Sequence, residues 1–238
     1  MSSMSSSSPS PMEPHGLPSI GDDGQNGQDG LMLDELDQII VPREPLAAIL
    51  AEEQAAGARC VFTNGIYDLL HVGHIQLLWR AHALGDLLVV GLNSDASTRR
   101  LKGPARPLIP QAERAETLAA LAMVDFVTVF EEDTASETLL TLRPAVYVKG
   151  GDYATPDPNA RVRDYLVGPE DLRRLVAGQA PEDASLAALG GLVERLPEAP
   201  VVASYGGSLA LLAYLPGHST TALIERIVSR YAPGGSQT

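Results

Sequence analysis

Short runs of apolar residues alternate with stretches of helical periodicity between residues 59 and 153. The runs predict four strands, at Cys60–Thr63, Asp86–Leu92, Asp125–Phe130 and Ala145–Val148. Apolar positions three and four residues apart predict the intervening helices, at Gly73–Ala83, Gln111–Met123 and Thr134–Leu142. Strands that alternate with helices indicate an α/β fold, with a mainly parallel sheet and helices on both faces. Sheets of this kind bind ligands at the carboxyl ends of their strands.

Outside this stretch the pattern is less regular. We predict helices at Glu44–Ala56 and Ser219–Tyr231, and strands at Val201–Ala203 and Leu209–Tyr214. Between them, residues 154–196 interrupt the alternation with short helices at Pro169–Ala177 and Ala184–Glu194. We interpret this stretch as a helical insertion within a domain of residues 44–238. Such an insertion could cover a site or build the contact of a homodimer.

The N-terminal residues differ in composition from the rest of the chain. Residues 1–43 contain Ser, Pro, Gly and Asp in place of apolar periodicity, which predicts a disordered acidic tail. The first 58 residues hold ten acidic residues against Arg43 alone, a net charge of −9 out of −13 for the 238-residue chain. The predicted core is therefore close to neutral, and its charge does not exclude a polyanionic ligand.

Composition excludes several classes of protein. Cys60 is the only cysteine, which excludes an intramolecular disulfide and favours a reducing compartment. No apolar run approaches the roughly 18–20 residues of a membrane span, and the N-terminus lacks the basic and apolar regions of a secretory signal. The acidic balance argues against non-specific nucleic-acid binding, which depends on neutralising phosphates. We therefore expect a cytoplasmic protein with neither a membrane nor a nucleic-acid partner.

Two histidines lie in the segment that joins the first strand to the following helix, Thr63–His74. His71 and His74 are three residues apart, so both imidazoles share one face of the first helical turn. The free N–H groups and the positive dipole end of a helix N-terminus favour an anion there. Gly65 and Gly73 let a ligand approach the backbone closely. The segment therefore predicts a phosphate cradle.

The same histidine pair is also compatible with a metal site. Zinc would need a third protein ligand, for which Cys60 and Asp68 are candidates. Their spacing matches no recognisable zinc motif, whereas the strand, the glycines and the helix start around the pair favour a phosphate.

Lysine is rare in this chain, because 15 of its 17 basic residues are arginine. The two exceptions, Lys102 and Lys149, follow predicted strands on the ligand side of the sheet. Lys102 belongs to the stretch from Arg99 to Arg114, where five basic residues against Glu113 give a local charge of +4. An ammonium on a flexible stem suits a phosphate whose geometry changes during a reaction. We expect both lysines to bind phosphate; the alternative is two surface lysines retained by chance.

Hydroxyl residues open the last predicted helix. In Gly217–Thr221, the hydroxyls of Ser219, Thr220 and Thr221 could bind a further phosphate or serve as ordinary helix caps. A hydrolase nucleophile elbow is excluded because Thr221 stands where that motif requires a second glycine. Asp95 is expected either to cap the helix after the second strand or to contact a ligand hydroxyl. The glycine fingerprints of dinucleotide-binding and P-loop proteins are absent from the sequence.

The segment Thr63–His74 resembles the signature of the HxGH nucleotidyltransferases, the cytidylyltransferase-like family. Further segments are similar to one branch in particular, the adenylyltransferase domain for D-glycero-β-D-manno-heptose 1-phosphate. These segments are Asn93–Thr98, Leu101–Gly103, Arg106–Pro107, Lys149–Tyr153 and Ser219–Thr221. The resemblance covers roughly residues 45–153 and 196–232. It implies a Rossmann-like fold and transfer of a nucleotidyl group from a nucleoside triphosphate to a phosphate ester.

The resemblance also implies roles for individual residues. As catalytic residues, His71 and His74 would stabilise the transition state and Lys102 would neutralise the reacting phosphates. The residues implied to bind the nucleotide are Thr63, Asn64, Gly65, Gly73, Arg114, Lys149, Gly150, Gly151, Asp152, Tyr153, Ser219, Thr220 and Thr221. The acceptor substrate is assigned to Asp68, Asn93, Asp95 and Lys102. Magnesium (Mg²⁺) is expected to accompany ATP, with no firm protein ligand and Asp68 as the one candidate.

These roles imply in-line attack of a sugar 1-phosphate oxygen on the α-phosphorus of ATP, giving ADP-heptose and pyrophosphate. A sugar kinase domain is often fused to this branch and is absent from this sequence, so a separate kinase is expected to make the acceptor. Alternatives with the same chemistry are cytidylyl transfer to glycerol 3-phosphate or phosphoethanolamine, and adenylyl transfer as in FAD synthetases. A non-catalytic nucleotide-binding module on the same fold is a further alternative.

Overall fold

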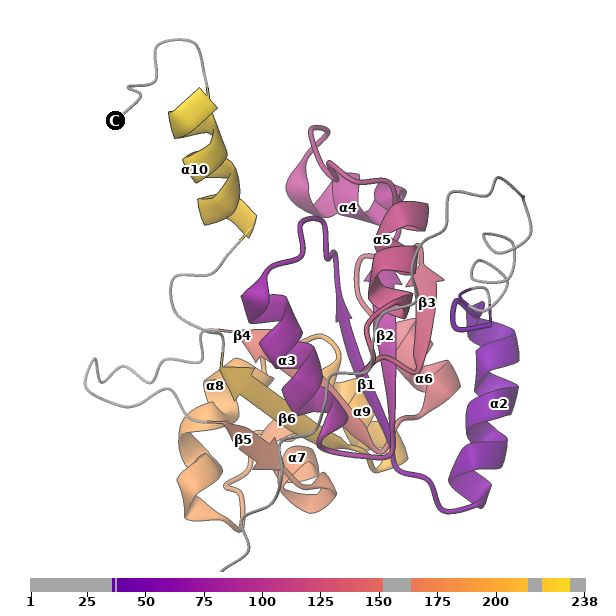
Figure 1. Cartoon of the computed structure of the whole chain (residues 1–238). Helices are drawn as coiled ribbons and strands as arrows, with labels where there is room; N and C mark the ends of the chain where they lie inside the picture. The colour runs from indigo at the N-terminus through magenta and orange to yellow at the C-terminus, as the bar shows by residue number, and fades with distance from the viewer. Residues whose placement is uncertain (1–35, 37, 152–163, 214–219, 232–238) are drawn as a thin grey trace, which may run out of the picture.

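The structure is a computed structural model that describes residues 36, 38–151, 164–213 and 220–231. The described residues form a six-stranded sheet in the order β3-β2-β1-β4-β6-β5 (Figure 1). Its strands are β1 (Cys60–Gly65), β2 (Leu87–Asn93), β3 (Phe126–Phe130), β4 (Val146–Gly151), β5 (Tyr165–Val167) and β6 (Ser208–Ala213). Neighbouring strands run parallel except β5, which pairs antiparallel with β6 at the edge. The predicted Rossmann-like α/β fold with a mainly parallel sheet is therefore confirmed.

Helices cover both faces of this sheet. One face is covered by α3 (Val72–His82) and α5 (Gln111–Ala119). The other is covered by α2 (Arg43–Ala55), α6 (Ser136–Leu142), α7 (Pro169–Val176) and α9 (Ala199–Tyr205). The remaining helices are α4 (Asp95–Lys102), η1 (Ala184–Leu189), α8 (Gly190–Val193) and α10 (Thr220–Tyr231). Helix α10 has no buried residue and lies apart from the sheet (Figure 1). Within the described ranges no helix is long and apolar enough to span a bilayer.

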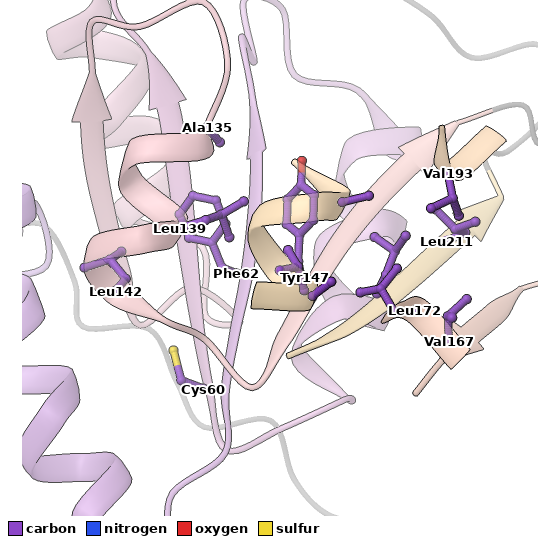
Figure 2. Packing of buried hydrophobic residues seen from close by; sticks show 14 of the residues in the cluster. Cys60, Phe62, Ala135, Leu139, Leu142, Tyr147, Val167, Leu172, Val193 and Leu211 are labelled. Carbon is purple, nitrogen blue, oxygen red and sulfur yellow. The ribbon is translucent and has the colours of Figure 1, made fainter. Parts of the chain in front are cut away.

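Successive residues of the central strands point into two different cores. In β1, Val61 packs with α3 and α5, whereas Cys60 and Phe62 pack with the helices of the opposite face. Figure 2 shows this second core, in which the ring centroids of Phe62 and Tyr147 are 6.2 Å apart. Burial on both faces explains why these strands have near-continuous apolar runs in the sequence.

The end of the predicted N-terminal tail is ordered against the sheet. Residues 1–35 and 37 lie outside the described residues. Ile40, however, forms a parallel bridge with Val127 of β3. The Val127 N–H donates to the carbonyl of Ile39, and the Val41 N–H donates to the carbonyl of Val127. The predicted disorder is therefore wrong for residues 38–43, because their apolar side chains and backbone groups add to the β3 edge.

Residues 164–196 are packed into the body of the domain, although the pattern of the sequence predicts an insertion here. β5 extends the sheet, and α7 follows it. Apolar side chains from α7, η1 and α8 join the same core as Phe62; they are Leu172, Leu175, Leu186, Leu189 and Val193. Residues 154–163 lie outside the described part of the chain. The stretch is not purely helical, because it contains the strand β5, which was not predicted.

The strand predicted at Val201–Ala203 is wrong, because these residues belong to helix α9. Adjacent valines suggest a strand locally, but a proline in the first turn and buried residues at Ala199, Val202 and Ala203 follow helical spacing. Gly206 ends the helix with φ +82°, the left-handed conformation that glycine adopts without strain. The helix places the residue before it, Glu198, inside the domain.

Candidate functional site

The candidate site lies at the carboxyl ends of β1, β2 and β4. The chain passes from β1 to β2 and β3 on one side, then crosses to β4 and β6 on the other, so β1 and β4 flank a topological switch point. His71 and His74 follow β1, Asn93 ends β2, and Lys149 lies near the end of β4. The fold therefore brings these predicted residues to one edge of the sheet.

His71 forms the N-cap of α3. Its Nδ1 accepts a hydrogen bond from the Gly73 N–H at 3.1 Å. In a neutral imidazole this bond places the remaining proton on Nε2, so that nitrogen is the donor of the ring. The ring of His71 stacks on that of His74, with centroids 3.9 Å apart and planes inclined by 22°. The two imidazoles therefore share a face at a helix N-terminus, as the sequence predicted.

His74 is enclosed between two rings. Besides His71, it contacts Tyr67, whose ring centroid is 5.3 Å away. Burial and, to a lesser extent, repulsion by His71 together lower the pKa of His74 from 6.5 to about 4. Its buried Nδ1 has no hydrogen-bond partner among the described residues. At neutral pH the ring is therefore uncharged, and an approaching anion would favour its protonated form.

The lowered pKa of His74 predicts loss of stability in mild acid. In the unfolded chain this imidazole takes up a proton near pH 6.5, whereas in the folded protein it does so only near pH 4. The stability that neutral His74 contributes is thus complete above pH 6.5 and is lost as the pH falls toward 4. Urea unfolding of the wild type and His74→Gln at pH about 7 and about 5 measures this difference. We expect the wild type to lose more stability over that interval; equal losses would contradict the lowered pKa.

Asp68 anchors a loop and is not open to solvent. Its side chain is 1% exposed and forms an ion pair with Arg106, with Oδ2 and Nε 2.5 Å apart. Its other oxygen, Oδ1, accepts from the backbone N–H groups of Leu108 at 2.7 Å and Ile109 at 3.0 Å. Because both oxygens already have protein partners, this geometry disfavours Asp68 as a ligand of substrate or magnesium. Its role as a loop anchor was missed, because its partners are distant in sequence.

Arg114 does not face an open phosphate site, contrary to the role that the resemblance implied. Its side chain is 1% exposed, and its Nη2 donates to Asp95 Oδ1 at 2.7 Å. The remaining bonds go to the carbonyls of Ile109 at 2.9 Å, Ile66 at 2.5 Å and Asn93 at 3.0 Å. The guanidinium thus joins the segments that follow β1 and β2. We assign it a positioning role.

The local charge of +4 between residues 99 and 114 is largely cancelled in space. Arg106 pairs with Asp68, Arg114 with Asp95, and Arg100 with Asp133 at 2.7 Å. Lys102 and Arg99 lie exposed at the end of α4, with no ion pair to any other described residue. Lys102 therefore keeps an available ammonium, which is consistent with its predicted role.

The residues around the end of β2 have mainly structural contacts. Ser94, not Asp95, is the N-cap of α4, because its Oγ accepts from the Ser97 N–H at 3.1 Å. The prediction that Asp95 caps this helix is therefore wrong. Asn93 is 3% exposed and donates through Nδ2 to Ser97 Oγ. A direct contact of Asn93 or Asp95 with substrate remains a prediction.

A hydrogen-bonded chain connects β1 to β4. Tyr147 donates its hydroxyl hydrogen to Asn64 Oδ1 at 2.8 Å and accepts from Lys149 Nζ at 3.0 Å. Lys149 is also 3.5 Å from Glu198 Oε1, a contact that no local sequence pattern predicts. Thr63 is buried, and its hydroxyl donates to the Val148 carbonyl at 3.0 Å. This hydrogen bond joins β1 to the neighbouring strand β4. Gly65, Gly150 and Gly151 lie half-buried at the same edge, whereas Gly73 is buried in the first turn of α3.

Ser219, which belongs to the predicted C-terminal phosphate site, lies outside the described residues. So do Asp152 and Tyr153, which were also predicted to bind the nucleotide. Thr220 begins α10, and its Oγ1 donates to the carbonyl of Leu69 at 3.5 Å. This contact brings the start of α10 to Leu69, two residues before His71 in the sequence. Thr221 is exposed. The start of α10 therefore contacts the segment that leads into the histidine pair.

The alternative of a zinc site finds no support in the described residues. No group of three or more His, Cys, Asp or Glu side chains among them could hold a metal ion. Cys60 is buried at the first residue of β1, whereas His71 and His74 follow the last. Burial raises the pKa of the Cys60 thiol to about 12. A thiol with this pKa stays protonated at neutral pH and is a poor metal ligand.

Comparison with known proteins gives a consistent family match. The cytidylyltransferase-like family matches residues 62–226. The chain is 46% identical over 205 residues to "Bifunctional protein HldE" of Geobacter sulfurreducens, covering 86% of this chain and 34% of that protein. It is also 46% identical over 200 residues to "Bifunctional protein HldE" of Syntrophotalea carbinolica, covering 84% and 33%. The chain thus spans about a third of the length of these relatives.

One solved structure is similar over a smaller region. It is described as the lipopolysaccharide core biosynthesis protein from Thermoplasma volcanium. The two chains are 31% identical where they match, over 42% of this chain and 80% of the other, with a TM-score of 0.37. This overall similarity is too low to add to the fold described above.

Proposed function

The chain belongs to the cytidylyltransferase-like family of nucleotidyltransferases, and from this premise we propose that it transfers AMP from ATP to a sugar 1-phosphate. The proposed acceptor is D-glycero-β-D-manno-heptose 1-phosphate, and the products are ADP-heptose and pyrophosphate. The stacked pair of His71 and His74 at the start of α3 carries this proposal, because it supplies donors beside a helix N-terminus at the switch point of the sheet.

The proposed reaction is one in-line displacement. A phosphate oxygen of the sugar 1-phosphate forms a bond to the α-phosphorus of ATP, while the bond from that phosphorus to the bridging oxygen of pyrophosphate breaks. The acceptor is already an anion at neutral pH, so the step requires no strong general base. Catalysis then consists of positioning and of stabilising the charge on the transferred group. A site of imidazole, ammonium and backbone N–H groups fits this need without a pair of catalytic carboxylates.

Each predicted catalytic side chain has a place in this scheme. His71 Nε2–H can donate to a phosphate oxygen, since Nδ1 is occupied by the Gly73 N–H. His74 is neutral at pH 7 when no ligand is bound and can become protonated beside the triphosphate. Lys102, exposed on α4, would approach from the side of β2. The dipole of α3 adds a partial positive charge at the same position.

Magnesium is proposed to enter as the counter-ion of ATP. The described residues contain no cluster of metal-ligating side chains, and both oxygens of Asp68 are occupied by protein groups. This donor set does not fit a resident metal site. It fits a magnesium ion whose ligands are mainly triphosphate oxygens and water, as is usual for this ion.

Heptose is favoured over other acceptors by sequence similarity. The segments around Asn93, Lys102 and Lys149 resemble the heptose branch, and the two relatives named above match over more than four-fifths of this chain. The acceptor carries its phosphate on the anomeric oxygen of the sugar, where a sugar kinase can place it. We propose that a separate kinase active site performs that step.

A substrate-crossed assay tests the proposal. The full chain is incubated with MgATP or MgCTP, crossed with heptose 1-phosphate, glycerol 3-phosphate, phosphoethanolamine and flavin mononucleotide, and pyrophosphate release is measured. We expect release only with ATP and heptose 1-phosphate, together with a nucleotide-sugar product. Release with CTP and an alcohol phosphate would instead establish the cytidylyltransferase alternative. Binding of ATP without release for any acceptor would support the non-catalytic module.

A further inference from the structure

Glu198 lies almost completely inside the domain, although glutamate is normally exposed. Its residue is 3% exposed, and its carboxylate points toward the end of β4. Oε1 is 3.5 Å from Lys149 Nζ and 3.5 Å from the backbone nitrogen of Ala135. The other oxygen, Oε2, is buried without a hydrogen-bond partner among the described residues. A buried carboxylate that lacks some of its hydrogen bonds lowers the stability of the fold, so its presence here needs an explanation.

Helix capping explains only part of this arrangement. Glu198 is the N-cap residue of α9, but its side chain forms no capping bond to that helix. Ala135 is the N-cap residue of α6, and its N–H contact to Glu198 is long for a hydrogen bond. Two helix N-termini near a carboxylate are electrostatically favourable. Neither helix, however, requires the carboxylate to lie at ion-pair distance from Lys149.

The hydrogen bonds beyond Lys149 have a fixed direction. An ammonium can only donate, so the Tyr147 hydroxyl must accept from Lys149 and can donate only its own hydrogen. Asn64 therefore presents its carbonyl oxygen to Tyr147 and leaves its NH₂ group as a donor. The Tyr147 ring is completely buried within the core of Figure 2, so it holds this alignment rigidly. The chain runs from Glu198 through Lys149 and Tyr147 to Asn64, the residue before Gly65.

We propose that Glu198 is a positioning residue that holds the Lys149 ammonium at the nucleotide site. Lysine has a flexible four-carbon stem, and a lysine side chain that is 27% exposed near the end of a strand would otherwise sample many positions. Within the described part of the chain, Glu198 is the one carboxylate that forms an ion pair with it. Glu198 holds Lys149 beside β1. The hydrogen bonds from Lys149 to the Tyr147 hydroxyl and from that hydroxyl to Asn64 then restrain the Asn64 side chain as well. The inference rests on the proposed function, since it places Lys149 in contact with ATP.

A double-mutant cycle tests whether Glu198 acts through Lys149. The four proteins are the wild type, Glu198→Gln, Lys149→Met and the double variant. For each, ATP affinity is measured by calorimetry without acceptor, and kcat and KM for ATP are measured by pyrophosphate release. We expect Glu198→Gln to weaken ATP binding about tenfold, within the range of coupled contacts. In the Lys149→Met background the same change should have almost no further effect.

The controls separate positioning from folding. Glu194→Gln removes the same charge from an exposed position four residues earlier and should leave ATP affinity unchanged. Thermal unfolding of every variant reports any structural cost. If Glu198→Gln does not fold, Glu198→Asp keeps the charge but withdraws it from Lys149, and it should weaken ATP binding in the same direction.

Two results would overturn the inference. One is wild-type ATP affinity in a folded Glu198 variant, and the other is an equal loss with and without Lys149. In both cases a wild type that binds ATP and releases pyrophosphate leaves the proposed function intact. A wild type that fails both assays contradicts the proposed function itself, and the inference fails with it.

Discussion

Replacement of His74 by alanine is expected to lower kcat by about 10²–10³, the usual cost of removing one donor that stabilises a developing oxyanion. The ring packs against Tyr67 and His71, and its buried Nδ1 is shielded from water, which lowers the local dielectric constant. Its Nδ1 lacks a protein partner among the described residues and is therefore not needed to hold the fold. Turnover is measured by pyrophosphate release, and the fold by circular dichroism.

His82→Ala is the matched control for this change. His82 lies at the other end of the same helix, with its side chain 40% exposed and 3.7 Å from Asp125. We expect the control to keep wild-type turnover, because this end of α3 is remote from the carboxyl edge of the sheet. A His74→Ala protein that is folded and turns over at nearly the wild-type rate would contradict the site assignment.

The effect of His74→Ala should appear in kcat more than in KM. A group that stabilises charge developing only in the transition state contributes little to ground-state binding. If ATP affinity falls as much as kcat/KM, His74 binds the ground-state triphosphate and its role is only one of binding. The calorimetric titration used for Glu198 distinguishes the two cases directly.

The alternating strands and helices could be predicted because their cause is local. Val61, Phe62 and their neighbours are buried on both faces of a parallel sheet, so β1 is a continuous apolar run. The histidine pair could be predicted for a similar reason. His71 caps the helix that His74 belongs to, so spacing along the chain determines their contact.

The elements that were missed depend on contacts far away in sequence. β5 has three residues and exists because Tyr165, Leu166 and Val167 pair with β6. Helix α9 contains adjacent valines, and packing against α7 and β6 overrides their strand propensity. The three residues of β5 carry no local pattern that distinguishes a strand from a loop.

The charges around the site could not be predicted for the same reason. The sequence suggested an open basic stretch, but Arg100 is neutralised by Asp133, 33 residues later, and Arg114 by Asp95, 19 residues earlier. Glu198 approaches Lys149 only because α9 packs beside β6 and β6 pairs with β4. The net charge of a sequence segment therefore describes the electrostatic field around it only when its ion-pair partners lie in the same segment.

Arg114→Met is expected to destabilise the protein by about 3–5 kcal/mol, the usual cost of breaking a buried ion pair by removing one partner. The change leaves the carboxylate of Asp95 and the carbonyls of Ile66 and Asn93 without their donor. Asp95 is 23% exposed and can recover water, whereas Asn93 is buried and cannot. Urea unfolding measures the loss, and Arg99→Met, at an exposed position on α4, should stay within about 0.5 kcal/mol of the wild type.

The two roles considered for Arg114 predict opposite results for this variant. A guanidinium that faced the triphosphate would be poorly satisfied in the free protein, so its removal would weaken ATP binding and leave stability nearly unchanged. A guanidinium that joins the ends of β1 and β2 is fully used before any ligand arrives, so its removal lowers stability whether or not ATP is present. Arg114→Lys should recover only part of the loss, because one ammonium cannot reach acceptors spread around a planar fork. If Arg114→Met has wild-type stability but binds ATP more weakly, Arg114 instead belongs to the nucleotide site.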